Sequence, residues 1–309
     1  MRILFMGSPD FAVVCLDALL SSSHTVLAVV SQPDKPKGRG KMLAPTAIKT
    51  FAEEKGLDIY TPDKIKDGEL AEVLDKYKPD CIVVVAYGKI LPDYVLSYPR
   101  YGCVNIHGSL LPKYRGASPM QFALLNGDKV TGITSMLMDS GLDTGDILLK
   151  TEVEISETDN FESLHDKMAR AGALNLVETL DRLERGEITP IKQEGESSYA
   201  SLIDKNMRKI DFTESTDGIY NKIRAFSPFP TAFSVLSGKI MKIYASEKIE
   251  KCEERFAENC GDVLSDDMLI VRTSDGAIRL TDIAPEGKRR MTDTEYMRGV
   301  KDKRNLKFQ

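Results

Sequence analysis

The sequence predicts an α/β protein in which a doubly wound, mostly parallel sheet is followed by a smaller domain built mainly of strands. Over the first half of the chain, short continuously apolar runs alternate with amphipathic helical segments. Buried parallel strands have this appearance because helices cover both faces of their sheet. Beyond about residue 206 the pattern changes to strand pairs separated by Ser-Gly or Ser-Asp-Gly, which are typical of β-hairpins. A chain of 309 residues is long enough for two such domains.

The elements of the first domain follow from apolar periodicity. The run RILFMG is a buried strand, and Ser8 followed by Pro9 predicts a capped helix start directly after it. Further strands are expected at residues 24–32, 57–61, 81–87, 102–106 and 132–138, and helices at 11–20, 46–56 and 66–78. The longest helix is expected at 160–187, with Asp159 as its cap because Glu162 follows at capping-box spacing. Its expected buried stripe consists of Phe161, Leu164, Met168, Leu174, Val177, Leu180 and Leu183.

The second domain is predicted to be a small β-barrel. Hairpins are expected at residues 231–246 and 268–284. The polar stretch ITPIKQEGESSYA that precedes them is typical of a linker. We therefore predict a first domain at 1–189, a linker at 190–205 and a second domain at 206–309.

Charge, cysteine and histidine contents exclude several classes of protein. The net charge of -5 argues against a globally basic nucleic-acid coat. Residues 206–309 nevertheless hold 19 Lys and Arg against 17 Asp and Glu, which suits a polyanion that contacts this part alone. The amino-terminal apolar run is too short for a signal sequence and no run approaches about 18 apolar residues, so we expect a cytoplasmic protein without a membrane segment. Five cysteines without a C-x-x-C pair and three scattered histidines predict reduced thiols and no metal site.

A cluster of basic residues lies in the loop at 33–45. Its cations alternate with Pro and Gly, which disfavour a helix or a central strand; they are Lys35, Lys37, Arg39 and Lys41. Four cations on an irregular backbone suit phosphate groups, and a solvated surface loop is the equally supported alternative. Lys288, Arg289 and Arg290 form a second basic group with the same two interpretations.

The stretch VNIHGSLLPKYRGASP contains the strongest candidate for a catalytic site. Asn105 and His107 are two residues apart on a predicted strand, so their side chains point to the same face. They lie at the carboxyl edge, where parallel sheets place their ligands. Imidazole exchanges protons near neutral pH, and a side-chain amide can donate to a developing oxyanion. A structural histidine at a strand end is the alternative that these residues alone leave open.

Three acids at a neighbouring strand end are candidate partners for His107. Asp139, Asp143 and Asp146 lie in the glycine-rich loop DSGLDTGDIL. An Asp near a His stabilises the imidazolium and fixes the tautomer, but acids in such loops also cap turns. Spacing does not choose among the three. Cys103 is better explained as a small buried strand residue than as a nucleophile.

Together, NIHGSLLPKYRGASP and MDSGLDTG resemble the paired signature of enzymes that transfer formyl groups from 10-formyltetrahydrofolate. The resemblance is to the methionyl-tRNA formyltransferase family and spans nearly the whole chain. Further matching segments, in the family order, are MRILFMGSPDFA, SQPDKPKGRGKMLAP, DCIVVVAYGKILP, IRAFSPFPTAF and APEGKRRM. The resemblance implies a Rossmann-like catalytic domain at 1–189 and an OB-like, tRNA-contacting barrel at 206–309.

The resemblance also implies roles for individual residues. The catalytic trio is matched by Asn105, His107 and Asp143. The folate-lining segments are matched by Ser109, Leu110, Leu111 and Pro112, and by the backbone around Ala86, Tyr87 and Gly88. The insertion that engages the acceptor end of tRNA is matched by Lys35, Lys37, Arg39 and Lys41, with Arg39 ranked highest.

The function implied by this resemblance is formylation of the free amino group of initiator methionyl-tRNA for translation initiation. The formyl donor is 10-formyltetrahydrofolate, no metal is needed, and we expect a cytoplasmic monomer. Two alternatives stay open: a folate-dependent formyltransferase acting on a small amine, such as glycinamide ribonucleotide or an amino sugar, and a non-catalytic RNA-binding protein. A nicotinamide dehydrogenase is disfavoured because Gly7 stands where the fingerprint G-x-G-x-x-G needs three glycines.

Overall fold

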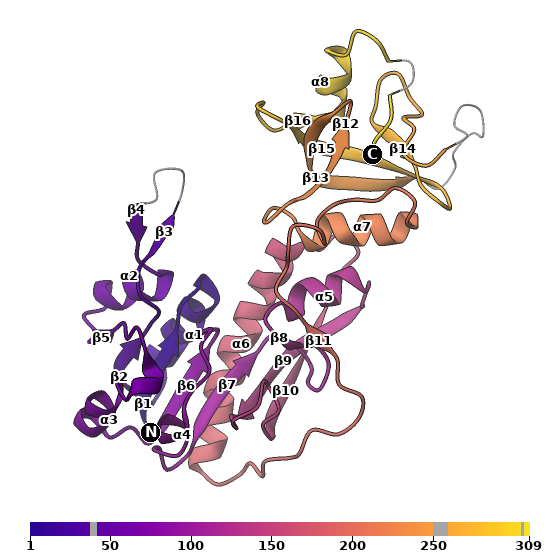
Figure 1. Ribbon diagram of the computed structural model, residues 1–309. Coiled ribbons are helices and arrows are strands. Elements are labelled where there is room, and N and C mark those ends of the chain that lie inside the picture. Colours follow the sequence, from indigo (N-terminus) through magenta and orange to yellow (C-terminus); the bar gives the residue numbers. More distant parts are fainter. Residues whose placement is uncertain (38–41, 250–258, 304–305) are drawn as a thin grey trace. The chain divides into compact units, whose positions relative to one another are not determined.

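A computed structural model describes residues 1–37, 42–249, 259–303 and 306–309 (Figure 1). The chain divides into two compact units. The first consists of Met1–Pro119, Val130–Glu154 and His165–Ala200, and the second of Met120–Lys129, Ile155–Leu164 and Ser201–Gln309.

The first unit is built around a seven-stranded sheet with the order β10-β9-β7-β6-β1-β2-β5. The strands are β1 (Arg2–Gly7), β2 (Thr25–Val30), β5 (Ile59–Tyr60), β6 (Cys81–Val85), β7 (Cys103–His107), β9 (Val130–Leu137) and β10 (Ile147–Glu154). From β5 to β7 all neighbours are parallel, whereas β9 runs antiparallel to both β7 and β10. The predicted mostly parallel sheet is confirmed.

Helices cover both faces of this sheet. They are α1 (Asp10–Leu20), α2 (Ala47–Glu54), the 3-10 helix η1 (Ile65–Asp67), α3 (Ala71–Tyr77), α4 (Asp93–Leu96) and α6 (Phe161–Glu184). Leu4 and Met6 of β1 share a buried core with Leu74 of α3 and Val95 of α4. On the other face α6 approaches closely at Gly172, because a Cβ atom there would lie 3.1 Å from Phe11 Cζ and 3.5 Å from Ile106 Cγ2.

Helix α6 corrects two details of the sequence prediction. Leu174 is 74% exposed, whereas the polar Asn175 and Thr179 are buried. These two side chains meet polar partners on the sheet: Asn175 Nδ2 donates to Thr151 Oγ1 at 3.0 Å, and the Ser135 and Thr179 hydroxyls lie 2.7 Å apart. Apolarity alone therefore misplaced part of the buried stripe.

Two predicted helix caps are also wrong. The cap of α6 is Asn160 and not Asp159, since Asn160 Oδ1 accepts from Ser163 N at 2.9 Å and Ser163 Oγ accepts from Asn160 N at 3.1 Å. Ser8 does not cap α1, which begins at Asp10 with Pro9 at its N-cap position and no side-chain cap.

Two small strand pairs accompany the large sheet. β3 (Lys35–Lys37) pairs antiparallel with β4 (Met42–Ala44) in the basic loop. β8 (Arg115–Gly116) pairs in parallel with β11 (Tyr199–Ala200). The second pair brings the polar stretch before the β domain back to the segment that follows β7.

The second unit is a five-stranded antiparallel sheet that curls into a half-barrel, with the order β12-β13-β15-β14 and β16 paired to β15. Its elements are α5 (Pro119–Leu125), α7 (Thr216–Ala225), β12 (Ala232–Leu236), β13 (Lys239–Ile249), β14 (Ile270–Arg272), β15 (Ala277–Pro285), β16 (Met291–Thr292) and α8 (Asp293–Arg298). Both predicted hairpins are present, and the first turns at Ser237 and Gly238 with φ values of 51° and 75°. Positive φ at both positions is the geometry of a type I′ hairpin turn.

Within the described residues, none of the helices combines the length and apolar character needed to cross a membrane.

Candidate active site

Three of the residues singled out in the sequence meet at the carboxyl end of β7. Asn105 and His107 point to the same face of the sheet, and Asp143 lies in the loop between β9 and β10. Asn105 Nδ2 lies 3.5 Å from Asp143 Oδ1, and His107 Nδ1 lies 3.7 Å from Asp143 Oδ2. An amide, an imidazole and a carboxylate therefore gather around one point, although β7 and the Asp143 loop are far apart in the chain.

The contact made by Nε2, the other ring nitrogen of His107, determines which tautomer the neutral ring adopts. His107 Nε2 lies 2.9 Å from the carbonyl oxygen of Tyr114. A carbonyl oxygen only accepts hydrogen bonds, so Nε2 carries a hydrogen in this arrangement. The neutral ring then keeps its lone pair on Nδ1, the atom that faces Asp143. Nδ1 is therefore the atom of His107 that can accept a proton.

Asp143 is held in an unusual backbone conformation. Its φ of 53° lies in the left-handed region, which residues with a side chain rarely adopt. Its carboxylate accepts a hydrogen bond from Gly116 N at 2.7 Å through Oδ2, the same oxygen that faces His107. This bond fixes the carboxylate on the His107 side.

The other two acids of the loop lie in different surroundings. Asp139 Oδ1 accepts from Gly141 N at 3.0 Å and from Thr144 Oγ1 at 2.7 Å, so Asp139 caps its own turn. The backbone carbonyl of Asp146 accepts from Leu137 N at 2.9 Å and continues the pairing of the two strands. Of the three acids left open by spacing, Asp143 is the one whose carboxylate meets His107.

The segment Ser109–Pro112 forms a firm wall beside the three residues. Ser109 and Leu111 are fully buried, and Thr134 ties them together: its Oγ1 donates to Ser109 O at 2.7 Å and accepts from Leu111 N at 3.1 Å. Leu110 and Pro112 are partly exposed. The exposed surface of this segment therefore belongs to Leu110 and Pro112, whereas Ser109 and Leu111 are held inside the protein.

A second wall is formed by backbone rather than by side chains. Ala86 and Gly88 are exposed and have φ values of 47° and 76°. The Tyr87 side chain between them is 1% exposed and turns into the core, where its hydroxyl has no hydrogen-bond partner among the residues that the structure describes. Gln32 Nε2 donates to the Tyr87 carbonyl at 2.6 Å. This turn presents main-chain groups to solvent on a rigid support.

The basic loop begins next to this second wall. Lys35 is exposed and donates to Gln32 Oε1, and Gln32 in turn holds the Tyr87 carbonyl. Lys37 lies at the end of β3, whereas Arg39 and Lys41 fall outside the described residues. Of the four cations of this loop, the structure therefore describes Lys35 and Lys37.

Comparison with known proteins identifies the family. Residues 1–180 match the family model described as formyl transferase, and residues 202–301 match the formyl transferase C-terminal domain. A methionyl-tRNA formyltransferase from Caldanaerobacter subterraneus subsp. tengcongensis is 46% identical over 302 residues, which cover 97% of this chain and 97% of the relative. The chain belongs to the methionyl-tRNA formyltransferase family. The predicted family and the predicted enzyme class, formyl transfer, are confirmed.

Solved structures agree with this family in fold. A methionyl-tRNA formyltransferase from Clostridium thermocellum superimposes with a TM-score of 0.57 at 20% identity, covering 82% of this chain and 95% of that one. HypX from Aquifex aeolicus, solved in complex with tetrahydrofolic acid, gives a TM-score of 0.64 at 18% identity over 99% of this chain. This chain spans 50% of the HypX chain.

Several residues around this candidate site were missed by the sequence analysis. The Tyr114 carbonyl contacts His107, and the Gln193 side chain contacts the Asp143 carbonyl. Ser198 in turn bonds the backbone of Tyr114. Gln193 and Ser198 both lie in the stretch predicted to be a linker. A polar run such as KQEGESS carries no signal that marks one glutamine or one serine as partly buried. The pairing of β11 with β8 is what brings them to the site.

Two further observations concern a thiol nucleophile and a metal site. Cys103 is 1% exposed, and burial raises the pKa of its thiol to about 12, so the thiol stays protonated at neutral pH. Among the residues that the structure describes, no group of three His, Cys, Asp or Glu side chains is placed to hold a metal ion.

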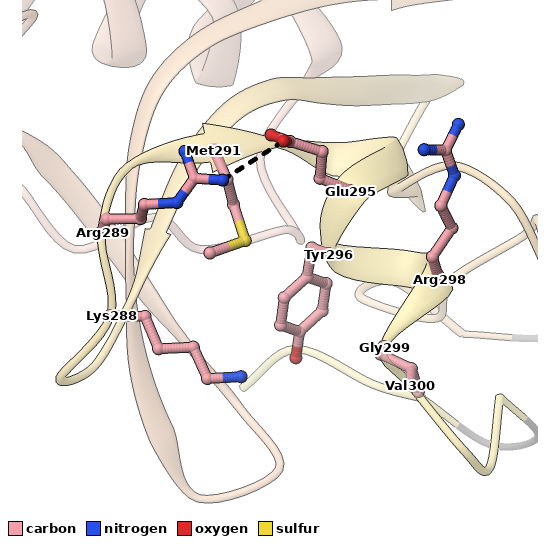
Figure 2. A pocket seen from close by; sticks show the side chains of 8 residues that line it. All are labelled: Lys288, Arg289, Met291, Glu295, Tyr296, Arg298, Gly299 and Val300. Carbon is pink, nitrogen blue, oxygen red and sulfur yellow. Dashed lines mark hydrogen bonds and ion pairs between the residues drawn. The ribbon is translucent and has the colours of Figure 1, made fainter.

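The second unit carries a basic cavity beside α8 (Figure 2). Its volume is about 520 Å³, and it is lined by Lys288, Arg289, Met291, Glu295, Tyr296, Arg298, Gly299 and Val300. The Tyr296 ring points into the hollow, and the Lys288 side chain extends toward it (Figure 2). Arg289 pairs with Glu295 at 3.4 Å, and Arg290 outside the cavity pairs with Asp282 at 2.6 Å.

Proposed function

We propose that this protein transfers the formyl group of 10-formyltetrahydrofolate to the α-amino group of methionine esterified to initiator tRNA. The product is the formylmethionyl-tRNA that begins translation. The observation that carries the proposal is the meeting of Asn105, His107 and Asp143 at the carboxyl end of β7. These are the three groups that transfer of a formyl group between two nitrogens requires: a hydrogen-bond donor for the oxygen, a group that moves protons, and a carboxylate that supports it.

Asn105 would stabilise the negative charge that develops on the formyl oxygen. When the amine attacks the formyl carbon, the electron pair of the C=O bond moves to oxygen. The Asn105 amide carries two N–H donors, and one of them faces Asp143 Oδ1 at 3.5 Å. The second N–H is then available to the oxyanion, and the contact with Asp143 fixes the plane of the amide.

His107 would move the proton between the two nitrogens. The attacking amine gains a positive charge and must lose a proton, whereas the leaving nitrogen must gain one as its bond to carbon breaks. His107 Nδ1 accepts the first proton and returns it to the leaving nitrogen, so no net proton is consumed. Between these steps the ring is an imidazolium with both N–H groups directed at acceptors, the Tyr114 carbonyl and the Asp143 carboxylate.

The two walls beside these residues suit a folate. The exposed main chain around Ala86 and Gly88 offers hydrogen-bonding groups to a flat heterocycle, and the partly exposed Leu110 and Pro112 offer apolar surface. A mostly apolar pocket with a few fixed polar groups is the usual form of a cofactor site. The bound folate supplies the activated formyl group, and the protein positions it. The donor we assign is the 10-formyl form, because N10 is bonded to an aryl ring and an arylamine is a good leaving group.

Binding of the tRNA acceptor end is assigned to Lys35, Lys37, Arg39 and Lys41. Phosphate contacts from exposed cations supply most of the sequence-independent affinity for a nucleic acid. In the second domain the cavity beside α8 combines Lys288 and Arg298 with an aromatic ring, a combination that suits a sugar-phosphate backbone and a base. We assign catalysis to residues 1–189 and tRNA contact to 206–309, joined by 190–205, in a cytoplasmic monomer.

One assay tests the proposed function. The protein is incubated with 10-formyltetrahydrofolate and charged initiator methionyl-tRNA, and formylmethionine is detected after the ester is hydrolysed. We expect formylmethionine from the wild type and a large loss of product with His107→Gln at matched circular dichroism. Formylation of an amino sugar nucleotide or of glycinamide ribonucleotide without formylation of the tRNA would assign the chain to a small amine. Binding of tRNA without any turnover would instead indicate a non-catalytic RNA-binding protein.

A further inference from the structure

The stretch between α6 and the second unit lies against the active site and does not run free. Ile191 N and Ile147 O lie 2.9 Å apart, and Ile147 N and Ile191 O lie 2.7 Å apart, so the stretch is fastened to the start of β10. Most residues from 191 to 200 are exposed, whereas Gln193 and Ser198 are partly buried and Ala200 is buried. The partly buried pair consists of polar residues whose side chains face the catalytic segments.

Gln193 holds the loop that carries Asp143. Its Nε2 donates to the Asp143 carbonyl at 2.8 Å and to the Gly145 carbonyl at 2.9 Å. Its Oε1 accepts from Arg115 Nε at 3.1 Å and from Arg115 Nη2 at 2.7 Å. Each hydrogen-bonding group of the side-chain amide is therefore used, and the amide ties the Asp143 loop to the segment that contains Tyr114, Arg115 and Gly116.

Ser198 holds the other partner of His107. Ser198 Oγ accepts from Tyr114 N at 2.9 Å, and Ser198 O accepts from Arg115 N at 2.8 Å. Tyr114 has a φ of 59° and presents its carbonyl to His107 Nε2. Tyr114 and Asp143 thus share two properties: both have a left-handed backbone, and both are bonded by a side chain from the same stretch of the chain.

We propose that Gln193 and Ser198 are positioning residues for formyl transfer. Gln193 fixes the acceptor that faces His107 Nδ1, and Ser198 fixes the acceptor that faces His107 Nε2. The left-handed region is disfavoured for residues with a side chain. These hydrogen bonds to the backbone of Asp143 and Tyr114 therefore help to keep both acceptors in place, together with the bond from Gly116 N to the Asp143 carboxylate. The stretch predicted to be a linker thus holds both hydrogen-bond acceptors of His107, the proposed proton-transfer group. We call Gln193 and Ser198 together the clamp. This inference rests on the function proposed above.

The proposal is tested with four single variants of the full chain. Gln193→Ala and Ser198→Ala each remove one arm of the clamp. Glu194→Ala and Ser197→Ala are matched controls, since both are exposed neighbours in the same stretch. For each variant we measure kcat, the KM for each substrate, the pH dependence of kcat and the thermal unfolding midpoint.

We expect kcat to fall by about 10- to 100-fold in the two clamp variants, because misplacement of a reacting group by about 1 Å costs up to that much. We expect the KM for both substrates to stay within about threefold of the wild type, since neither residue is proposed to touch a substrate. The controls should keep wild-type kcat. Equal unfolding midpoints for all five proteins would separate positioning from general stability.

A double-mutant cycle gives the sharpest readout. In an Asp143→Ala background there is no carboxylate to position, so adding Gln193→Ala should reduce kcat by less than about twofold further. A full multiplicative loss in that background would overturn the positioning role of Gln193. So would wild-type kcat in Gln193→Ala.

A measurement independent of turnover separates this inference from the proposed function. Nitrogen-15 spectra report which ring nitrogen of His107 carries the proton, and the chain has only two other histidines, His24 and His165. The wild type should show the Nε2–H form, and Ser198→Ala should show a mixture of both tautomers. An unchanged spectrum in Ser198→Ala would overturn its role. If the wild type transferred no formyl group at all, the proposed function would fail, and this spectrum would still test the clamp.

Discussion

His107 Nδ1 and Asp143 Oδ2 lie 3.7 Å apart, and the side chains of both residues are almost fully buried, with 6% and 13% exposure. The distance is too long for a hydrogen bond but short for two charges in a poorly solvated site. Nδ1 therefore keeps its lone pair beside the carboxylate without sharing a hydrogen with it. The proton-carrying role proposed for His107 requires this, because the lone pair must be able to accept a proton from the substrate.

The first prediction concerns this pair. Asp143→Asn keeps the shape and the left-handed backbone preference but removes the charge, so we expect kcat to fall on the order of 100-fold. Steady-state kinetics with saturating methionyl-tRNA and folate would measure it. Asp139→Asn is the control, since Asp139 caps its own turn and should leave kcat unchanged. Wild-type rates in Asp143→Asn would remove Asp143 from the mechanism.

The second prediction concerns the proposed oxyanion donor. Asn105→Ala should lower kcat by about 100- to 1000-fold, the usual cost of removing one donor to an oxyanion. The effect should fall on kcat and kcat/KM equally, because the oxyanion exists only in the transition state. Asn105→Asp should be at least as slow, since it places a second carboxylate next to Asp143. A variant that raised KM alone would show that Asn105 only binds substrate.

The third prediction concerns Gly116, whose N–H bonds the Asp143 carboxylate. Its φ is 108°, and a Cβ atom there would lie 2.8 Å from the Ala200 carbonyl oxygen. Gly116→Ala should therefore lower the free energy of unfolding by about 1 to 3 kcal/mol, the cost of a strained backbone together with a displaced neighbour. Chemical denaturation measures this change.

Gly186→Ala is the matched control for Gly116→Ala. Gly186 also has a positive φ, of 70°, but apart from its own chain neighbours no atom of a described residue lies within 4 Å of a Cβ built there. Gly186→Ala should lower the free energy of unfolding only by the cost of the strained backbone, and it should keep full activity. Equal losses of stability in the two variants would show that the contact with Ala200 carries no cost.

The fourth prediction concerns Cys103, which lies four residues before His107. Because burial raises the pKa of its thiol to about 12, the reactive thiolate is nearly absent at pH 8. Iodoacetamide should leave Cys103 unmodified in the folded protein and should modify the partly exposed Cys260. Peptide mass spectrometry measures both sites at once. Cys103→Ala should keep wild-type kcat, whereas a large loss would reopen a role for the thiol.

The fifth prediction concerns the basic loop. Replacing Lys35, Lys37, Arg39 and Lys41 by Gln together should weaken tRNA binding and reduce the slope of log K against log salt by about one for each lost phosphate contact. Binding measured across a salt series gives the slope. Replacing four exposed lysines elsewhere in the first unit by Gln is the control for the same change in net charge; they are Lys55, Lys64, Lys66 and Lys150. A slope equal to that of the wild type would make the loop an ordinary solvated surface.

Much of the fold was predictable because it depends on local patterns. A strand buried on both faces is apolar at every position, as in β1, where residues 3 to 6 have no exposed surface, and such a run is visible in the sequence. Ser237 and Gly238 both have positive φ, and Ser-Gly between two strand segments is a local hairpin signal. The two wrong helix caps are local errors, but the misplaced residues of α6 arose where a polar side chain met a polar partner far away in the chain. Asn175 on α6 is buried because Thr151 accepts its hydrogen bond, and no periodicity contains that information.

The candidate active site was likewise predictable only where it depends on local patterns. That Asn105 and His107 lie on one face at the end of a strand was predictable, because side chains alternate at a period of two. That Asp143, rather than Asp139 or Asp146, meets His107 was visible in the three-dimensional structure alone, since it depends on how one loop folds over another strand end. Only the tertiary structure brought in Gln193 and Ser198, because strand pairing joins segments about eighty residues apart through backbone groups that every residue possesses.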